Sequence, residues 1–323
     1  MVRQVVTFFS FFFCILSIQA QESDFSQVIN NHLYTNPAFA GSKLCPRLII
    51  AARNSHISYG TAFMNFSASF DKYFESLQSG LGLLVLHSRK GKNFYTNTTY
   101  GAIYSKSIRL SRLKSIRTAM QVNYVQSIMT NRGLTYSEMF DPIEGPIFDK
   151  QEPDFSVTSH RFDAGVGGMW YSEKEYVGIS LCQLVKPKWK YSSKTPLYYR
   201  KYSIHAGKIF SLGGGFSKNK YDLLTNVYFQ KQYVSNQIII GCQVKRNVLA
   251  FGTWIKQSLK FDYHSFVILF GFYKNNIKFA YNMDIIFKTK GTRLYDTHEI
   301  SVAYLPGCNE KKKKFKAIKS PEL

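Results

Sequence analysis

The segment IKFAYNMDIIFK, residues 277–288, decides the fold class of this chain. Its large apolar side chains stand at every second position, and they alternate with Lys278, Ala280, Asn282 and Asp284. In an extended strand this spacing puts the apolar groups on one face and the polar groups on the other. The segment is therefore predicted to be a two-faced β-strand.

The same period of two recurs along most of residues 47–304. It predicts about fourteen strands, most of them roughly nine to thirteen residues long. They are placed at 47–56, 60–72, 80–88, 95–108, 115–129, 160–172, 175–184, 200–212, 220–231, 235–244, 247–257, 262–273, 276–288 and 296–304. Strands that cross a bilayer at a tilt need about 9–11 residues, whereas soluble strands average about 5–6. The lengths favour an all-β fold that is a transmembrane antiparallel β-barrel over a soluble β-sandwich.

The two faces of the strands have different roles in a membrane barrel. The apolar face contacts lipid, because only a closed sheet makes every backbone hydrogen bond internally. The polar face then lines a lumen. Polar residues expected on this inner face include Asp222, Asn226, Asn282, Asp284 and Glu299.

The lengths of the connections predict which end of the barrel faces outward. An even number of strands places both termini at one end, and outer-membrane barrels have short periplasmic turns and longer external loops. The two longest connections, 130–159 and 185–199, fall at the end opposite the termini and are predicted to be external. The second is basic, and its lysines are candidate partner-binding residues. They are Lys186, Lys188, Lys190 and Lys194.

The first twenty residues have the pattern of a secretory signal peptide. Arg3 precedes an apolar run that reaches Ile18, and small or polar residues lead to Ala20. We expect cleavage after Ala20, so that residues 1–20 are a signal peptide. The alternative is an N-terminal anchor helix.

The chain carries a formal net charge of +22, which indicates either an anionic partner or simply solvated lysines in the loops. Lipid phosphates of the outer membrane or an acidic protein fit an exported chain, and nucleic acid is not an expected partner. Residues 305–323 form a basic tail, predicted to be periplasmic, whose candidate partner-binding residues are Lys311, Lys312, Lys313 and Lys314. The alternative reading is that these lysines are solvated and the tail is disordered.

The sequence contains no recognisable catalytic or metal-binding pattern. The seven histidines are scattered without ligand spacing, and the glycine-rich stretches lack the lysine and the strand–helix context of a phosphate loop. We therefore expect neither an enzyme nor a bound metal or cofactor.

The segment between the leader and the first strand, residues 21–46, has a motif without period. Its residues are Phe25, Ser26, Gln27, Leu33, Tyr34, Asn36, Pro37, Ala38, Phe39 and Gly41. This motif resembles the N-terminal signature of the PorP/SprF family of the type IX secretion system of Bacteroidota. The chain departs from it at Glu22-Ser23, where the family often has Asp-Pro, and at residues 29–32. Downstream, residues 162–166 and 176–180 (FDAGV and YVGIS) are similar to the mid-chain pattern of the family.

The resemblance implies a non-enzymatic outer-membrane component of type IX secretion. Such a protein would support the secretion or surface attachment of adhesin cargo, or would couple the outer membrane to the periplasmic motor ring or translocon. The strand pattern leaves another class open, a passive channel or a hydrophobic-substrate transporter. We interpret residues 21–46 as a segment that packs at or in the periplasmic mouth and plugs it, because Pro37 fixes an extended approach and Gly41 permits a sharp exit. The alternative is a leader strand lying across the base of the barrel.

The cysteines allow one disulfide to be predicted from barrel closure. Cys45 stands just before the first predicted strand, and Cys308 just after the last. Closing the barrel pairs these two strands, which brings the two cysteines together in an oxidising compartment. Cys182 and Cys242 lie on strands that are not neighbours, so a Cys45–Cys308 bridge is the expected pairing.

Overall fold

The computed structural model describes residues 31–55, 63–91, 94–132, 140–141, 145–146, 153–185, 199–212, 221–232, 235–259, 263–288 and 295–307. The predicted signal peptide, the residues Phe25, Ser26 and Gln27, and the tail from Cys308 onward lie outside these ranges. No helix within them is long and apolar enough to span a bilayer.

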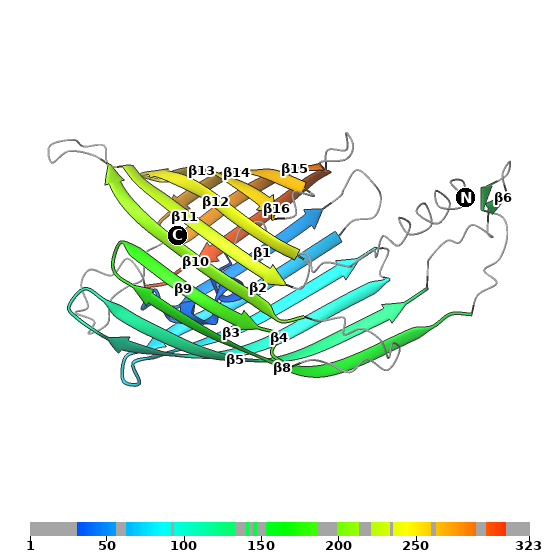
Figure 1. Cartoon of the computed structure of the whole chain (residues 1–323), viewed down its shortest axis with the longest axis horizontal. Helices are drawn as coiled ribbons and strands as arrows, with labels where there is room; N and C mark the ends of the chain where they lie inside the picture. Colours follow the sequence, from blue (N-terminus) through cyan, green and yellow to red (C-terminus); the bar gives the residue numbers. More distant parts are fainter. Residues whose placement is uncertain are drawn as a thin grey trace, which may run out of the picture.

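Fourteen strands close into one antiparallel barrel, which confirms the predicted fold class (Figure 1). They are β1 (Arg47–Ser55), β2 (Phe63–Phe74), β3 (Ser79–Lys90), β4 (Tyr95–Arg109), β5 (Ser115–Thr130), β8 (Ser156–Tyr171), β9 (Glu175–Cys182), β10 (Lys201–Leu212), β11 (Tyr221–Gln232), β12 (Ser235–Arg246), β13 (Leu249–Ser258), β14 (Tyr263–Lys274), β15 (Ile277–Lys288) and β16 (Tyr295–Tyr304). The barrel closes where β1 pairs with β16, from Leu48 opposite Tyr304 to Ser55 opposite Thr297. No sheet edge is left open by this arrangement, as a bilayer requires.

The connection between β5 and β8 is shorter than predicted and contains strands of its own. The prediction of one loop over 130–159 was wrong, because Thr130 pairs with Ser156 and the ladder continues inward from there. Residues 156–159 read SVTS and contain few large apolar groups, so the period-two pattern misses them. Within the connection, β6 (Phe140–Asp141) and β7 (Gly145–Pro146) form a separate two-stranded sheet.

The predicted division of the two strand faces is confirmed. On β15, Ile277 is 52% exposed on the outer face, whereas Asn282 and Asp284 are each 1% exposed on the inner face. Asn226 and Glu299 are likewise buried inside, and Asp222 is half-buried. The wall is thus apolar outside and polar inside, the reverse of a soluble protein and the pattern of a membrane barrel.

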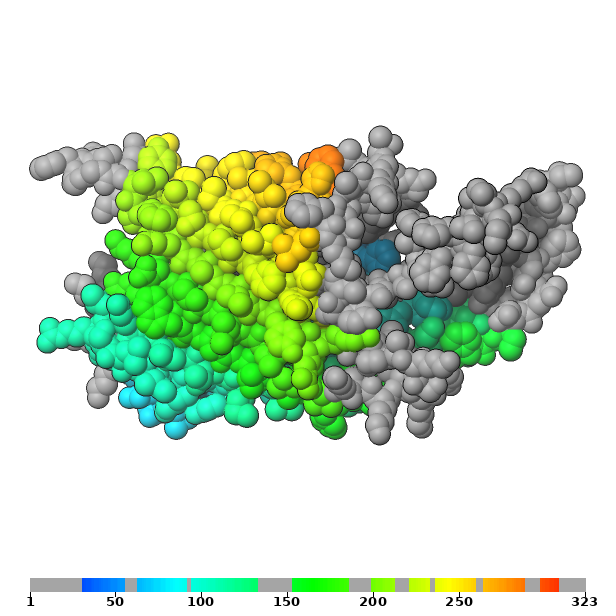
Figure 2. Space-filling model, viewed as in Figure 1, coloured from blue at the N-terminus to red at the C-terminus, as the bar shows by residue number. Residues whose placement is uncertain are grey.

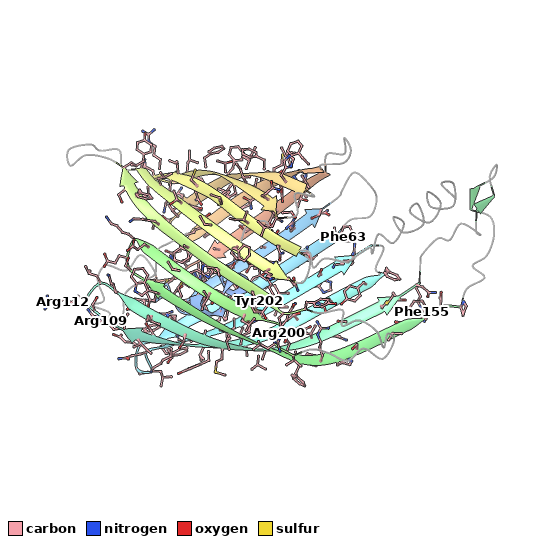
Figure 3. The ribbon with its side chains drawn as sticks, in the orientation of Figure 1. Phe63, Arg109, Arg112, Phe155, Arg200 and Tyr202 are labelled. Carbon is pink, nitrogen blue, oxygen red and sulfur yellow. The ribbon has the colours of Figure 1, made fainter. Side chains whose placement is uncertain are left out.

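The two ends of the barrel have different connections. We call the end where β1 begins and β16 finishes the terminal end, and the opposite end the loop end. Arg109 and Arg112 lie at the terminal end, and Phe155 lies at the loop end (Figure 3). Short turns at the terminal end place Asn247 (φ 51°) and Asn275 (φ 53°) in the left-handed region, which asparagine tolerates in tight hairpins. The connections 131–155 and 183–200 both leave the loop end, and their exposure to the cell exterior stays a prediction.

The outer wall can be tested with two apolar residues that are equally exposed. Met120 on β5 is 66% exposed and Leu113 in the turn before β5 is 62% exposed. We expect Met120→Arg to lower the free energy of unfolding in phospholipid vesicles by about 2–4 kcal/mol, and Leu113→Arg by about 1 kcal/mol or less. Urea titrations of the vesicle-embedded barrel measure both values. Equal effects of the two substitutions would contradict a lipid-facing wall.

Candidate functional site

Residues 31–46, here called the inner segment, lie inside the barrel toward the terminal end (Figure 1). The segment contains a short helix, α2 (His32–Thr35), and a 3-10 turn, η1 (Pro37–Phe39). Asn36 between them is extended (φ −154°, ψ 123°), as predicted for a residue before proline. Its side-chain oxygen accepts a hydrogen bond from the Ala38 N–H (2.8 Å) and so caps the turn that Pro37 begins.

The side chain of Asn36 joins the inner segment to three strands of the wall. Its Nδ2 donates to the carbonyl oxygens of Gly168 on β8 (3.2 Å) and Ile179 on β9 (3.0 Å). The same nitrogen lies 2.9 Å from Nε2 of His205 on β10. Asn36 is completely buried, so these contacts replace water at every polar atom of its amide group.

Phe39 forms the apolar centre of the inner segment. Its ring packs edge-on against His32 (5.2 Å between centroids) and Tyr176 (5.7 Å), and it stacks on His205 (5.4 Å). A buried cluster surrounds it that mixes segment and wall residues. Its members are Leu33, Ala38, Phe39, Ala40, Leu84, Ile103, Ala119, Met169, Tyr171, Tyr176 and Leu224. The inner segment therefore supplies part of the core of the barrel rather than resting on its surface.

The backbone of the inner segment is bound by side chains of the wall where the segment turns toward β1. The Ala40 carbonyl accepts from Ser105 Oγ and from Arg117 Nη1, each at 2.7 Å, and the Gly41 N–H donates to Asp71 Oδ2 at 2.7 Å. Gly41 has a φ of +67°, and a Cβ there would lie 2.8 Å from the Cα of Gly80. Glycine is needed at position 41 for both reasons.

Two buried arginines supply the positive charge at this point. Arg47 donates from Nε to Asp71 Oδ1 (2.8 Å) and from Nη2 to the Phe39 carbonyl (3.1 Å), and both ionic side chains are 2% exposed or less. The guanidinium of Arg117, which is fully buried, lies 5.6 Å from the ring centroids of both Tyr73 and Tyr171. Arg47 is thus ion-paired, whereas Arg117 is held by its hydrogen bond to the Ala40 carbonyl and by the two rings, and these contacts offset the cost of burying each charge.

Wall glycines make room for the inner segment. A Cβ at Gly167 would contact the Asn36 amide oxygen and the Pro37 ring, and one at Gly178 would contact the His205 ring. Ser180 Oγ, two residues beyond Gly178, donates to the Thr35 carbonyl at 3.0 Å. Residues 176–180, singled out by the sequence resemblance, thus lie against the N-terminal motif.

The structure brings together six of the predicted motif residues in one buried contact region. They are Leu33, Asn36, Pro37, Ala38, Phe39 and Gly41. Tyr34 is half-buried, and its hydroxyl accepts from Lys201 Nζ at 3.0 Å. The candidate lysines Lys186, Lys188, Lys190, Lys194, Lys311, Lys312, Lys313 and Lys314 lie outside the described residues.

Sequence reasoning missed the wall partners Arg47, Asp71, Lys201 and His205. Arg47 and Asp71 could have been identified from the sequence, because each is a charged residue at a strand position predicted to face inward. Across the described ranges, no group of three or more His, Cys, Asp or Glu side chains is placed to hold a metal ion.

The whole length of the barrel matches one protein family. The family model for the type IX secretion system membrane protein PorP/SprF aligns with residues 17–304. This chain belongs to the PorP/SprF family. It is therefore a component of the type IX secretion system that resides in the outer membrane. A comparison with curated protein sequences returned no match.

Solved outer-membrane barrels are similar in fold. A FadL homologue of Pseudomonas aeruginosa is 9% identical, over 86% of this chain and 95% of its own, with a TM-score of 0.46. The toluene transporter TbuX of Ralstonia pickettii is 8% identical, over 84% and 92%, with a TM-score of 0.47. Omp33 of Acinetobacter baumannii is 9% identical, over 81% and 99%, with a TM-score of 0.43. Similarity at this level carries no argument about what this chain transports or binds.

Cys45, at the end of the inner segment, is buried and disulfide-bonded. Cys308 lies outside the described residues, so the Cys45–Cys308 pairing stays a prediction. The register supports it, because Leu48 pairs with Tyr304 and extending that ladder by three residues sets position 45 opposite position 307.

We expect mass spectrometry of non-reduced peptides to find Cys45 linked to Cys308 in protein folded under oxidising conditions. The physical reason is barrel closure, which holds the two positions within the roughly 7 Å between Cα atoms that a disulfide needs. Cys242 carries a free thiol and serves as the internal control for alkylation. Recovery of Cys308 as an alkylated thiol would contradict the pairing.

The anchoring role of Asn36 can be tested by Asn36→Leu. The substitution keeps the approximate size of the side chain but removes the donors to Gly168 and Ile179 and the cap on Ala38. Each buried group left without a partner costs about 1–3 kcal/mol, so we expect the free energy of unfolding to fall by more than about 2 kcal/mol. Ser42→Ala, in the same segment, is the control, and about 1 kcal/mol or less is expected for it because the buried Ser42 hydroxyl has no hydrogen-bond partner among the described residues. Similar losses for both variants would show that Asn36 is not an anchor.

Proposed function

We propose that this PorP/SprF protein is a non-enzymatic support of type IX secretion whose barrel is closed by its own inner segment. In this role it supports the secretion or surface attachment of adhesin-type cargo, or couples the outer membrane to the periplasmic motor ring. The termini face the periplasm and the connections 131–155 and 183–200 face the cell exterior. The chain needs no cofactor for this role.

One observation carries the proposal, namely that the family motif is bound to the inside of the wall. Hydrogen bonds run from Asn31 to Ser67 on β2, from Ser105 and Arg117 to Ala40, and from Asn36 to β8 and β9. These contacts hold the inner segment inside the barrel, where it takes up part of the lumen. A solute pathway would need that space, so the arrangement favours a scaffold over a transporter.

The orientation is supported by the connections. Turns of two or three residues at the terminal end, such as 247–248 and 275–276, are typical of the periplasmic side. The longer connections at the loop end are where a rigid barrel usually carries its binding residues. The basic loop at 185–199 is on that side, which makes it the proposed contact for an acidic surface of the cargo.

The test replaces the four lysines of this loop. We expect a chain with Lys186, Lys188, Lys190 and Lys194 all changed to Gln to reduce surface display of one adhesin severalfold, because the loop loses four positive charges. The control changes the same four residues to Arg, which keeps the charge and should keep display normal. Antibody labelling of intact cells measures display, and heat-dependent gel mobility verifies that the barrel is folded. Normal display with the Gln variant would reject the loop as the cargo contact.

Planar bilayers separate the scaffold from the alternative class, a passive channel or hydrophobic-substrate transporter. The wild-type barrel should show no steady ion conductance, because the inner segment closes it. A stable conductance comparable to that of a porin would overturn the scaffold proposal, even if the lysine variants behaved as expected.

A further inference from the structure

The outer wall of the barrel has a hollow of about 740 Å³ between β8 and β14, on the side that faces the membrane. This volume lies within the range of roughly 300–1,000 Å³ that is usual for small-molecule sites. In the space-filling view the green and yellow strands form a closed outer wall in this region (Figure 2). Most of the side chains that line the hollow point outward from the wall, so the hollow opens on the lipid-facing surface.

Small residues produce this depression. Ala206 on β10 is flanked by larger outward residues, and Thr225, Cys242 and Thr253 are small side chains on the following strands. On the inner face, the Tyr176 ring lies against the backbone of Gly207, and the Trp254 ring lies against the backbone of Gly241. At these two positions only backbone separates the ring from the membrane side of the wall. Gly207 and Gly241 themselves line the hollow, so this part of its lining is backbone rather than side chain.

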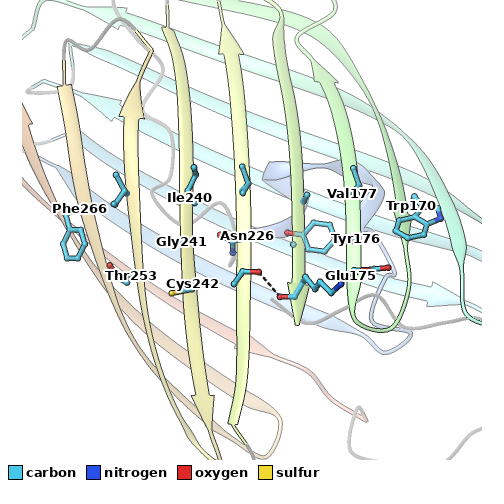
Figure 4. Close-up of a pocket in the computed structure, with 16 residues that line it drawn as sticks. Trp170, Glu175, Tyr176, Val177, Asn226, Ile240, Gly241, Cys242, Thr253 and Phe266 are labelled. Atoms are coloured by element: carbon cyan, nitrogen blue, oxygen red, sulfur yellow. Dashed lines mark hydrogen bonds and ion pairs between the residues drawn. The ribbon is translucent and has the colours of Figure 1, made fainter. Parts of the chain in front are cut away.

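The outward-facing residues that line the hollow form two rows across the strands (Figure 4). One row is apolar and runs through paired positions. Its members are Trp170, Val177, Ala206, Val227, Ile240, Ile255 and Phe266. The next row toward the terminal end is polar. Its members are Glu175, Lys208, Thr225, Cys242 and Thr253.

Positive charge gathers where the polar row meets the end of the barrel. Glu175 is the first residue of β9, and its Oε2 lies 3.2 Å from Lys208 Nζ in an ion pair that is about half exposed (52% for Lys208, 39% for Glu175). Lys114 Nζ lies 5.7 Å from the ring centroid of Trp170, and Lys174 is exposed in the adjoining turn. This edge therefore carries three lysines (Lys114, Lys174 and Lys208) and two carboxylates (Glu173 and Glu175), a local net charge of +1.

We propose that the hollow binds one anionic phospholipid, with an acyl chain along the apolar row and the headgroup phosphate at Lys208. The hollow faces the membrane, where lipid is the solvent. Its lining is mostly apolar, which suits an acyl chain, and Lys208 stands at its edge toward the terminal end, where an acidic headgroup would lie. Trp170 and Lys114 are placed as interfacial anchors beside that head. The Glu175 carboxylate competes with the phosphate for Lys208, which sets the affinity of the site.

The charge test uses two substitutions with opposite expected effects. Native mass spectrometry of the detergent-purified barrel, titrated with phosphatidylglycerol, should show one tightly retained lipid and weaker retention of phosphatidylethanolamine. We expect Lys208→Gln to weaken phosphatidylglycerol binding about fivefold, the effect of one basic residue at an anionic membrane surface. Glu175→Gln should strengthen binding, because it releases Lys208. If the ion pair were merely structural, both variants would weaken binding or neither would change it, and either result overturns the proposal.

The shape test fills the hollow. Ala206→Trp should abolish retention of the lipid, whereas Ala102→Trp, at an exposed outward position of β4, should leave it unchanged. Glycerol phosphate and palmitate, each added alone, should bind far more weakly than the whole lipid. Equal binding of glycerol phosphate would show that the site recognises only a phosphate. A dimer that Ala206→Trp disrupts would show that the hollow binds a second copy of the chain. Either outcome rejects the lipid site, as would unchanged retention in Ala206→Trp protein with normal heat-dependent gel mobility.

Discussion

The buried ion pair between Arg47 and Asp71 joins the inner segment to the wall of the barrel. Arg47 begins β1 and Asp71 lies opposite it on β2, so the pair belongs to the first hairpin. The remaining hydrogen bonds of both side chains go to the backbone of the inner segment, at Phe39 and Gly41. Leaving one member of such a pair without partners costs about 3–5 kcal/mol. The wall and the inner segment therefore stabilise each other. Without the segment, Arg47 and Asp71 would each lose a buried hydrogen-bond partner.

The same dependence explains why the motif has no period. The residues of its described part, 31–46, contact different parts of the wall. Asn36 is matched to backbone groups of β8 and β9, the Ala40 carbonyl to Ser105 and Arg117, and Gly41 to the close approach of Gly80. One continuous helix or strand would present its side chains at a regular interval and could not meet partners at these irregular positions. The segment is instead a short helix and a tight turn, held by side chains of the wall.

The sequence predicts the barrel well because its signal is local and repeated. On a strand such as β15, the alternation of Ile277 and Phe279 with Ala280 and Asn282 is set by contact with lipid outside and polar groups inside. The prediction failed at residues 156–159, where pairing with β5 extends the ladder without large apolar groups. It also did not predict β6 and β7, because strands of two residues are too short to show a period of two.

The contacts of the site depend on closure of the whole barrel. The sequence therefore reveals the residues of the motif but not their partners on the wall. The motif itself was recognisable, but Asn36 contacts Gly168, Ile179 and His205, which are 132, 143 and 169 positions away. The strand register brings these residues together, and nothing in the spacing of the histidines indicates it. The membrane-facing hollow is hidden for the same reason, since it arises from Ala206, Gly207 and Gly241 on two strands that must first be paired through β11.

Hydrogen–deuterium exchange of the backbone amides in residues 31–46 tests the central claim most directly. In the barrel folded in phospholipid vesicles, we predict that peptides covering Asn36 to Gly41 exchange as slowly as those from the strands β4 and β5, because the N–H of Gly41 is bonded to buried Asp71 and the N–H of Ala38 to Asn36. Exchange of these peptides at the rate of an exposed turn, such as residues 110–114, with the strands still protected, would contradict the account, because the inner segment would then leave the barrel while the wall stays intact.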